Sequence, residues 1–143
     1  EPELLETAGG IRAALPSLGE SPFLVVNGDI YTDFDFADLL KRMNDQPLPH
    51  LVMVPNPAHH FGGDFCLNES GQLMSSGDEF LTYSGIGVYQ SDFFVGNGTG
   101  KQMLRPLFDA AINENRIYGE VYRGLWSDVG TPERYAALKS QVP

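Results

Sequence analysis

The run FLVVNGD, residues 23–29, constrains the fold more than any other part of the sequence. Four consecutive apolar residues predict a short strand with both faces buried, which is typical of a parallel sheet covered by helices. The run ends in Asn27, Gly28 and Asp29, so the strand would deliver a carboxylate to the end of the sheet. Ligands of open α/β sheets bind at this carboxyl edge. The run therefore predicts both a sheet and a candidate site.

The segments after this strand continue the alternation of strand and helix. Residues 35–43 place apolar side chains at helical spacing, with Asp35 as the expected N-cap. Residues 50–55 form a second apolar run of strand length. A strand, a helix and a strand in close succession indicate a right-handed βαβ unit.

The chain before the first strand is expected to form a helix at residues 7–15. Thr7 is a suitable N-cap, and Pro16 and Gly19 are expected to end the helix. Further along the chain, residues 64–76 alternate around a turn that contains a glycine, which predicts a hairpin.

The second half of the sequence completes the pattern. Residues 81–90 predict a long strand, in which two glycines mark either a bulge or a close approach to the backbone. A helix at 105–115 and a strand at 117–123 follow. Residues 125–140 predict a strand that turns into a final helix capped by Thr131. This order predicts an α/β fold, with a Rossmann-like mixed sheet flanked by helices.

Composition excludes several classes of function. The net charge of −10 argues against nonspecific binding to nucleic acid, which needs a basic surface. It does not exclude a small anionic ligand, because a metal ion can reverse the field in one pocket. No apolar run approaches the roughly 20 residues of a membrane span. The single cysteine, Cys66, excludes an internal disulfide and suits a reducing cytoplasm, where we expect the protein.

Two acidic residues stand at equivalent positions in the predicted sheet. Asp29 follows the first strand, and Asp128 follows Leu125 and Trp126 and precedes Gly130. Alone, either aspartate is most simply a turn or cap residue. As a converging pair they suit Mg²⁺, which takes one or two carboxylates together with phosphate oxygens and water.

Other features carry weaker signals. The run ETAGGI, residues 6–11, puts two glycines in the first turn of a helix, where they suit either close approach of a ligand or simple packing. His59 and His60 lack a third ligand at metal-binding spacing and are interpreted as plain loop histidines. The run GNGTGK, residues 96–101, lacks the spacing of a phosphate-binding loop and is interpreted as a flexible surface turn.

Taken in order, the motifs LETAGGI, VVNGD, FGGDF, YSGIGVY and WSDVGTPERY resemble the sugar-1-phosphate nucleotidyltransferase family over nearly the whole chain. The resemblance implies the nucleotide-diphospho-sugar transferase fold. It also implies a reaction in which a nucleoside triphosphate and a sugar 1-phosphate give a nucleoside diphosphate sugar and pyrophosphate. UTP and N-acetylmuramic acid 1-phosphate are the favoured substrates, in recycling of cell-wall sugars, and GTP with mannose 1-phosphate is the alternative.

The resemblance also assigns roles to residues by motif position. It implies that Asp29 and Asp128 are catalytic and hold Mg²⁺. It places two groups around the substrates: Glu6, Thr7, Gly9, Gly10 and Asn27 at the nucleotide, and Gly63 and Gly85 at the sugar.

One family motif, the glycine-rich loop that grips the triphosphate, does not occur in the sequence. We therefore expect residues 1–143 to be the C-terminal portion of a single catalytic domain, with the N-terminal part missing, and to have no meaningful turnover alone. Without that part, strands at 23–26 and 51–54 are expected to have an open apolar face or edge. A regulatory domain that binds nucleotide sugars without turnover is a further alternative.

Overall fold

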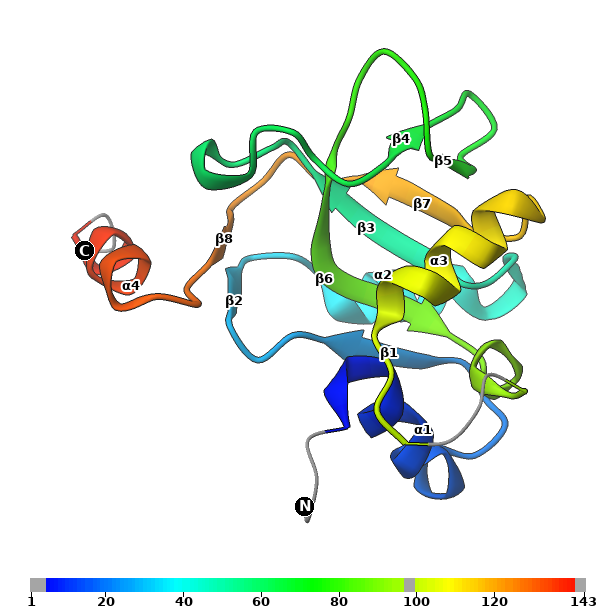
Figure 1. Cartoon of the computed structure of the whole chain (residues 1–143). Coiled ribbons are helices and arrows are strands. Elements are labelled where there is room, and N and C mark those ends of the chain that lie inside the picture. Colours follow the sequence, from blue (N-terminus) through cyan, green and yellow to red (C-terminus); the bar gives the residue numbers. More distant parts are fainter. Residues whose placement is uncertain (1–4, 97–99, 141–143) are drawn as a thin grey trace.

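A mixed four-stranded sheet forms the centre of the computed structural model, which describes residues 5–96 and 100–140 (Figure 1). The strands lie in the order β1 (Phe23–Val26), β6 (Thr82–Tyr89), β3 (His50–Val54) and β7 (Tyr118–Val121). Strand β6 is antiparallel to β1 and β3, and β7 is parallel to β3. The predicted mixed α/β fold is confirmed. The first two predicted strands, however, do not pair with each other, because β6 lies between them.

Helices cover both faces of this sheet (Figure 1). Alternate residues of β3 point to opposite sides, so both faces present apolar side chains. Leu51 and Met53 pack in a cluster with side chains from α1 (Glu6–Leu18) and α3 (Leu104–Asn113). Val52 packs on the other side with Leu39 of α2 (Phe36–Arg42).

The expectation of an open face or edge at 51–54 is wrong. Residues Leu51, Val52 and Met53 are 0% exposed, because β3 is an internal strand with a neighbour on each side. Strand β1 is an edge: within the described ranges it pairs only with β6, and its last residue, Val26, is 39% exposed.

Helix α1 differs from its prediction at both ends. It begins at Glu6 and ends at Leu18, so Pro16 lies inside it, and Thr7 is not its N-cap. The first turn needs no side-chain cap, because the N–H groups of Ala8 and Gly9 donate to the carbonyl oxygen of Gln102, at 3.0 and 3.2 Å. Gly19 is the C-cap that follows the last residue of the helix.

The other helices keep their predicted caps. Asp35 Oδ1 accepts a hydrogen bond of 2.9 Å from the N–H of Asp38 at the start of α2. Thr131 Oγ1 accepts one of 3.2 Å from the N–H of Arg134 at the start of α4 (Pro132–Lys139). Among the helices in the described ranges, none is long and apolar enough to cross a membrane.

Substitution of Asp35 with Ala is expected to lower the free energy of unfolding by about 1 kcal/mol, because an orphan N–H in the first turn of α2 loses its acceptor. Urea unfolding at neutral pH measures the change. Asp45→Ala, at an exposed position of the following 3-10 turn Met43–Asp45, is the control and should change stability by less than about 0.5 kcal/mol. Equal losses in the two variants would contradict the capping role.

Two smaller pairs of strands lie outside the central sheet. The predicted hairpin is present as β4 (Cys66–Leu67) and β5 (Leu73–Met74). The second pair, β2 (Ile30–Thr32) with β8 (Trp126–Asp128), is antiparallel. The sequence predicts the strand of β8 but not β2. Figure 1 shows that β8 leads away from the sheet to α4.

Candidate functional site

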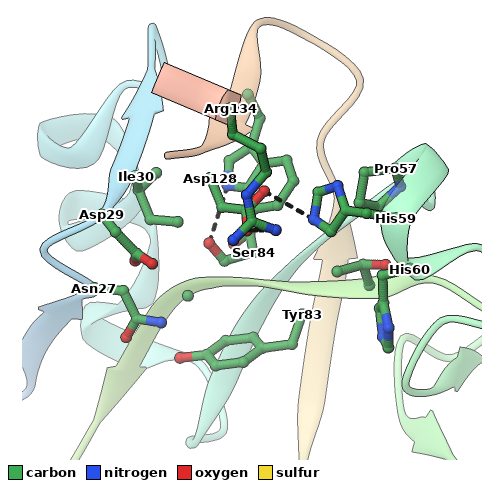
Figure 2. Close-up of a pocket in the computed structure, with 13 residues that line it drawn as sticks. Asn27, Asp29, Ile30, Pro57, His59, His60, Tyr83, Ser84, Asp128 and Arg134 are labelled. Carbon is green, nitrogen blue, oxygen red and sulfur yellow. Dashed lines mark hydrogen bonds and ion pairs between the residues drawn. The ribbon is translucent and has the colours of Figure 1, made fainter. Parts of the chain in front are cut away.

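A cavity of about 270 Å³ lies where β1 ends and the β2–β8 pair begins (Figure 2). Its walls come from the end of β1, the loop around the 3-10 turn Ala58–His60, the first half of β6, strand β8 and α4. Four residues with an assigned site role line it: Asn27, Asp29, Gly85 and Asp128. The other lining residues are Ile30, Pro57, His59, His60, Thr82, Tyr83, Ser84, Trp126 and Arg134.

The pairing of β2 with β8 brings the two aspartates together. Ile30 is the register partner of Asp128, and the N–H of Val129 donates to the carbonyl oxygen of Asp29 at 2.7 Å. Gly130 follows β8, and a Cβ at this glycine would lie 2.9 Å from Asp29 Oδ2. The two acids therefore reach one cavity from two short strands, although they are far apart in the sequence.

Asp128 lies between two basic side chains. Its Oδ2 is 3.1 Å from Nη1 of Arg134, and its Oδ1 is 3.0 Å from Nε2 of His59. The His59 contact has the distance of an ion pair but not the direction of a hydrogen bond. Asp128 Oδ1 is thus buried without a hydrogen-bond partner among the described residues. The sequence predicts His59 as a plain loop residue and gives no sign of this contact with Asp128.

Gly85 occupies a position in β6 that favours glycine. Its φ is +80°, and a Cβ there would lie 2.7 Å from Nδ2 of Asn27. The register of β3 against β6 shifts at Val52 and Met53, so the predicted alternatives of a bulge and a close approach both occur in this strand. The close approach is made by a side chain of the same cavity wall.

Gly85→Ala is expected to lower the free energy of unfolding by about 1–3 kcal/mol, because alanine is strained at this φ and Asn27 must move. Thermal or urea unfolding measures the loss. Gly28→Ala is the matched control, because a Cβ at Gly28 meets no atom within 4 Å of the described structure. A Gly85→Ala variant as stable as Gly28→Ala would contradict the strain.

The other residues with assigned roles do not line this cavity. Glu6 pairs with Lys101 at 3.2 Å, and a Cβ at Gly9 would lie 2.6 Å from the carbonyl oxygen of Gly100, so both positions have local packing roles. Thr7 and Gly10 share the first turns of α1, and a Cβ at Gly10 would meet open space. Gly63, with φ +65°, lies against the side chain of Asn56. Part of the predicted surface turn at 96–101 falls outside the described residues.

Several cavity residues carry no signal in the sequence. Ser84 and Tyr83 belong to an apolar strand, yet Trp126 Nε1 donates to the carbonyl oxygen of Ser84 at 2.9 Å and fixes the indole in the wall. Burial raises the pKa of Tyr83 to about 12, so its hydroxyl, 3.1 Å from that of Tyr89, stays protonated at neutral pH. In the sequence, Arg134 has the pattern of an ordinary surface charge in the first turn of a helix.

The carboxylates of the cavity suit a hard divalent cation that is also coordinated by a bound substrate. In the part of the chain that the structure describes, no three His, Cys, Asp or Glu side chains form a metal cage. The pair Asp29 and Asp128 fits a cation that takes one or two carboxylates and completes its shell with phosphate and water. Oδ1 of Asp128, which is buried beside His59 and accepts no hydrogen bond among the described residues, is an oxygen that could bind such a cation.

Comparisons with known proteins find nucleotidyltransferases that act on sugar 1-phosphates. N-acetylmuramate alpha-1-phosphate uridylyltransferase of Neisseria meningitidis is 44% identical over 133 residues, which cover 89% of this chain and 58% of the relative. Mannose-1-phosphate guanylyltransferase catalytic subunit beta of Dictyostelium discoideum is 28% identical, over 97% of this chain and 44% of the relative. The chain thus spans less than two thirds of the length of these relatives. A scan of protein-family models gives no match.

Solved structures show the same fold. HddC of Yersinia pseudotuberculosis superposes with a TM-score of 0.77 at 20% identity, covering 99% of this chain and 64% of that one. The inositol-1-phosphate CTP transferase of T. maritima gives a TM-score of 0.70 at 14% identity, over 91% of this chain and 58% of that one. The predicted fold and resemblance are confirmed: the chain has the fold of these solved structures, and in sequence it is similar to sugar-1-phosphate nucleotidyltransferases.

Proposed function

We propose that this chain carries the metal-binding part of an enzyme that makes a nucleoside diphosphate sugar and pyrophosphate from a nucleoside triphosphate and a sugar 1-phosphate. The observation that carries the proposal is the convergence of Asp29 and Asp128 on one cavity. UTP and N-acetylmuramic acid 1-phosphate are the proposed substrates, and the name and 44% identity of the Neisseria relative support them.

In the proposed reaction an oxygen of the sugar phosphate attacks the α-phosphorus of the triphosphate in line. A new oxygen–phosphorus bond forms, the bond to the β-phosphate oxygen breaks, and the electron pair leaves with pyrophosphate. Catalysis then consists of positioning two anions and neutralising their repulsion. Mg²⁺ held by Asp29 and Asp128 would supply that neutralisation.

The chain's own residues contribute the shape of the site. Trp126 and Ser84 fix the wall behind Asp128 through the hydrogen bond of the indole. The Oδ1 atom of Asp128 is buried, which limits water around this oxygen and strengthens its interaction with any cation. Positive charge inside the cavity is needed for binding of the anionic substrates, because the chain as a whole carries a net charge of −10.

The substrate-facing residues are part of the same proposal. Asn27 and Gly85 line the cavity next to the two acids, which supports contacts with the ribose or with the sugar. The open space at Gly10 supports close approach of a nucleotide to the first turns of α1. Glu6, Thr7 and Gly9 stay in the proposal as nucleotide-binding residues by motif position. Gly63 is proposed to face the sugar, on the turn before β4.

We further propose that the chain is the C-terminal portion of a catalytic domain, whose remainder supplies the grip on the triphosphate. The chain's 58% coverage of the Neisseria relative supports the first part of this proposal, that the chain is one portion of a longer protein. A cytoplasmic location belongs to the proposal too, supported by the free, buried thiol of Cys66.

Release of pyrophosphate from the full-length protein tests the function. Four nucleoside triphosphates are combined with the 1-phosphates of N-acetylmuramic acid, mannose and glucose, with and without Mg²⁺. We expect magnesium-dependent release to be fastest with UTP and N-acetylmuramic acid 1-phosphate. Preference for GTP and mannose 1-phosphate would reject the proposed substrates, and no release in any combination would reject the enzyme.

The 143-residue chain, assayed beside the full-length protein, tests the division of the domain. We expect no meaningful release from the chain alone, because the predicted triphosphate grip is outside it. Magnesium-dependent turnover by the isolated chain would show that residues 1–143 hold a complete site.

A further inference from the structure

Arg134 lies in the candidate site without a role in the reaction described above. Its Nη1 is 3.1 Å from Asp128 Oδ2, and its side chain is 30% exposed, so it faces the cavity from α4 (Figure 2). Its Nε is buried and has no hydrogen-bond partner among the described residues. A guanidinium has five N–H donors, so the contact with Asp128 leaves most of its binding capacity unused.

The guanidinium also lies close to the second acid. A Cβ at Gly130 would lie 2.9 Å from Arg134 Nη2 and equally 2.9 Å from Asp29 Oδ2. Both side chains therefore approach Gly130, while Asp128 pairs with Arg134 directly. Arg134 thus provides the positive charge beside both carboxylates in the absence of a metal.

A divalent cation on the two aspartates would change this balance. The carboxylate charge would be neutralised, and the cation would repel the guanidinium at short range. The freed donors would then face the cavity in which the substrate phosphates are proposed to lie. Arginine suits this task because its planar fork binds two phosphate oxygens at once.

We propose that Arg134 is a ligand of the sugar phosphate, held by Asp128 until a divalent cation takes that carboxylate. This inference rests on the proposed function of the cavity. It differs from a purely structural role, in which Arg134 only fixes α4 against β8. The two roles predict opposite effects on metal binding, because a competitor for Asp128 weakens metal binding whereas a structural clamp supports it.

Two titrations of the full-length protein by calorimetry test the inference. The first measures the affinity for N-acetylmuramic acid 1-phosphate in the presence of Mg²⁺, and we expect Arg134→Gln to weaken it about tenfold or more. The second measures the affinity for Mg²⁺ without substrate, and we expect the same variant to strengthen it several-fold. In steady state, KM for the sugar phosphate should rise more than KM for the nucleotide.

Arg123→Gln is the matched control, since this arginine is 63% exposed, pairs with Glu79 and does not line the cavity. Both affinities should stay at the wild-type values in this control. Arg134→Lys keeps the positive charge but lacks the planar guanidinium, so it should show a smaller loss of sugar-phosphate affinity. This variant tests the inference if Arg134→Gln does not fold.

Two results would overturn the inference while leaving the proposed function in place. One is an Arg134→Gln variant that binds the sugar phosphate as tightly as the wild type. The other is a variant in which the affinities for Mg²⁺ and for the sugar phosphate fall together, as a structural clamp predicts. A wild-type protein that binds none of the sugar 1-phosphates would overturn both proposals.

Discussion

Replacement of Asp128 with Asn in the full-length protein is expected to lower pyrophosphate release by a factor of about 10² or more, the range found when one preorganised electrostatic group is removed. The amide keeps the size of the side chain but loses the charge that a divalent cation needs. It also leaves Arg134 without its partner at 3.1 Å, so an unpaired positive charge stays beside the site and opposes metal binding. Turnover at several Mg²⁺ concentrations measures both effects.

The matched control is Asp109→Asn, which removes an aspartate that is 49% exposed and pairs with Arg105 at 3.0 Å on α3. It should leave turnover within about twofold of the wild type, as expected for a surface ion pair. Far-UV circular dichroism of both variants checks the fold. Asp128→Asn with wild-type turnover would reject the metal role of this carboxylate.

The same variant separates an enzyme from a regulatory domain. An enzyme should lose turnover while keeping its fold. A domain that only senses nucleotide sugars should show no turnover in the wild type and should still bind its ligand after the substitution. The convergence of Asp29 and Asp128 on one cavity favours the enzyme, because a domain that only senses nucleotide sugars need not keep both acids.

The elements that sequence predicts well are those with local signals. The strand at Phe23–Val26, the caps Asp35 and Thr131 and the hairpin of β4 with β5 each depend on residues that are adjacent or a few positions apart. The position of Asp29 directly after β1 is local in the same way, whereas Asp128 ends β8, which pairs with β2 outside the central sheet.

The features that sequence missed depend on contacts between distant segments. The insertion of β6 between β1 and β3 results from pairing across the chain, and no local pattern encodes it. Helix α1 starts one residue earlier than predicted because its N–H partner, Gln102, comes from another part of the sequence. His59 and Arg134 gain their places in the site only when β2 and β8 pair and bring Asp128 toward both.

A second cluster of charges, away from the candidate site, stabilises the fold. Glu120 of β7 accepts two hydrogen bonds from Arg42 of α2, at 2.8 and 2.9 Å, and lies 3.5 Å from Nε2 of His50 on β3. His50 and the Arg42 fork lower the pKa of Glu120 from 4.5 to about 2, against the opposing effect of burial. The His50 contact is long for a hydrogen bond, so the Arg42 fork is the firmer interaction. It joins α2 to β7.

Because the pKa of Glu120 is lower in the folded chain, its contribution to stability is present above pH 4.5 and is lost as the pH falls toward 2. After allowance for solvent screening, we expect that contribution to be about 2 kcal/mol. Glu120→Gln should therefore lower the free energy of unfolding by about this amount at pH 7 and reduce the further loss between pH 4.5 and 2.

Urea unfolding of the wild type and Glu120→Gln at pH 7, 4 and 3 measures the difference in slope. Glu114→Gln, which removes an exposed carboxylate paired with Arg116, is the control and should cost less than about 1 kcal/mol at pH 7. The two carboxylates differ in that only Glu120 is partly buried between three elements of the fold. If stability falls with pH equally steeply in the wild type and in Glu120→Gln, then carboxylates other than Glu120 cause the loss in acid.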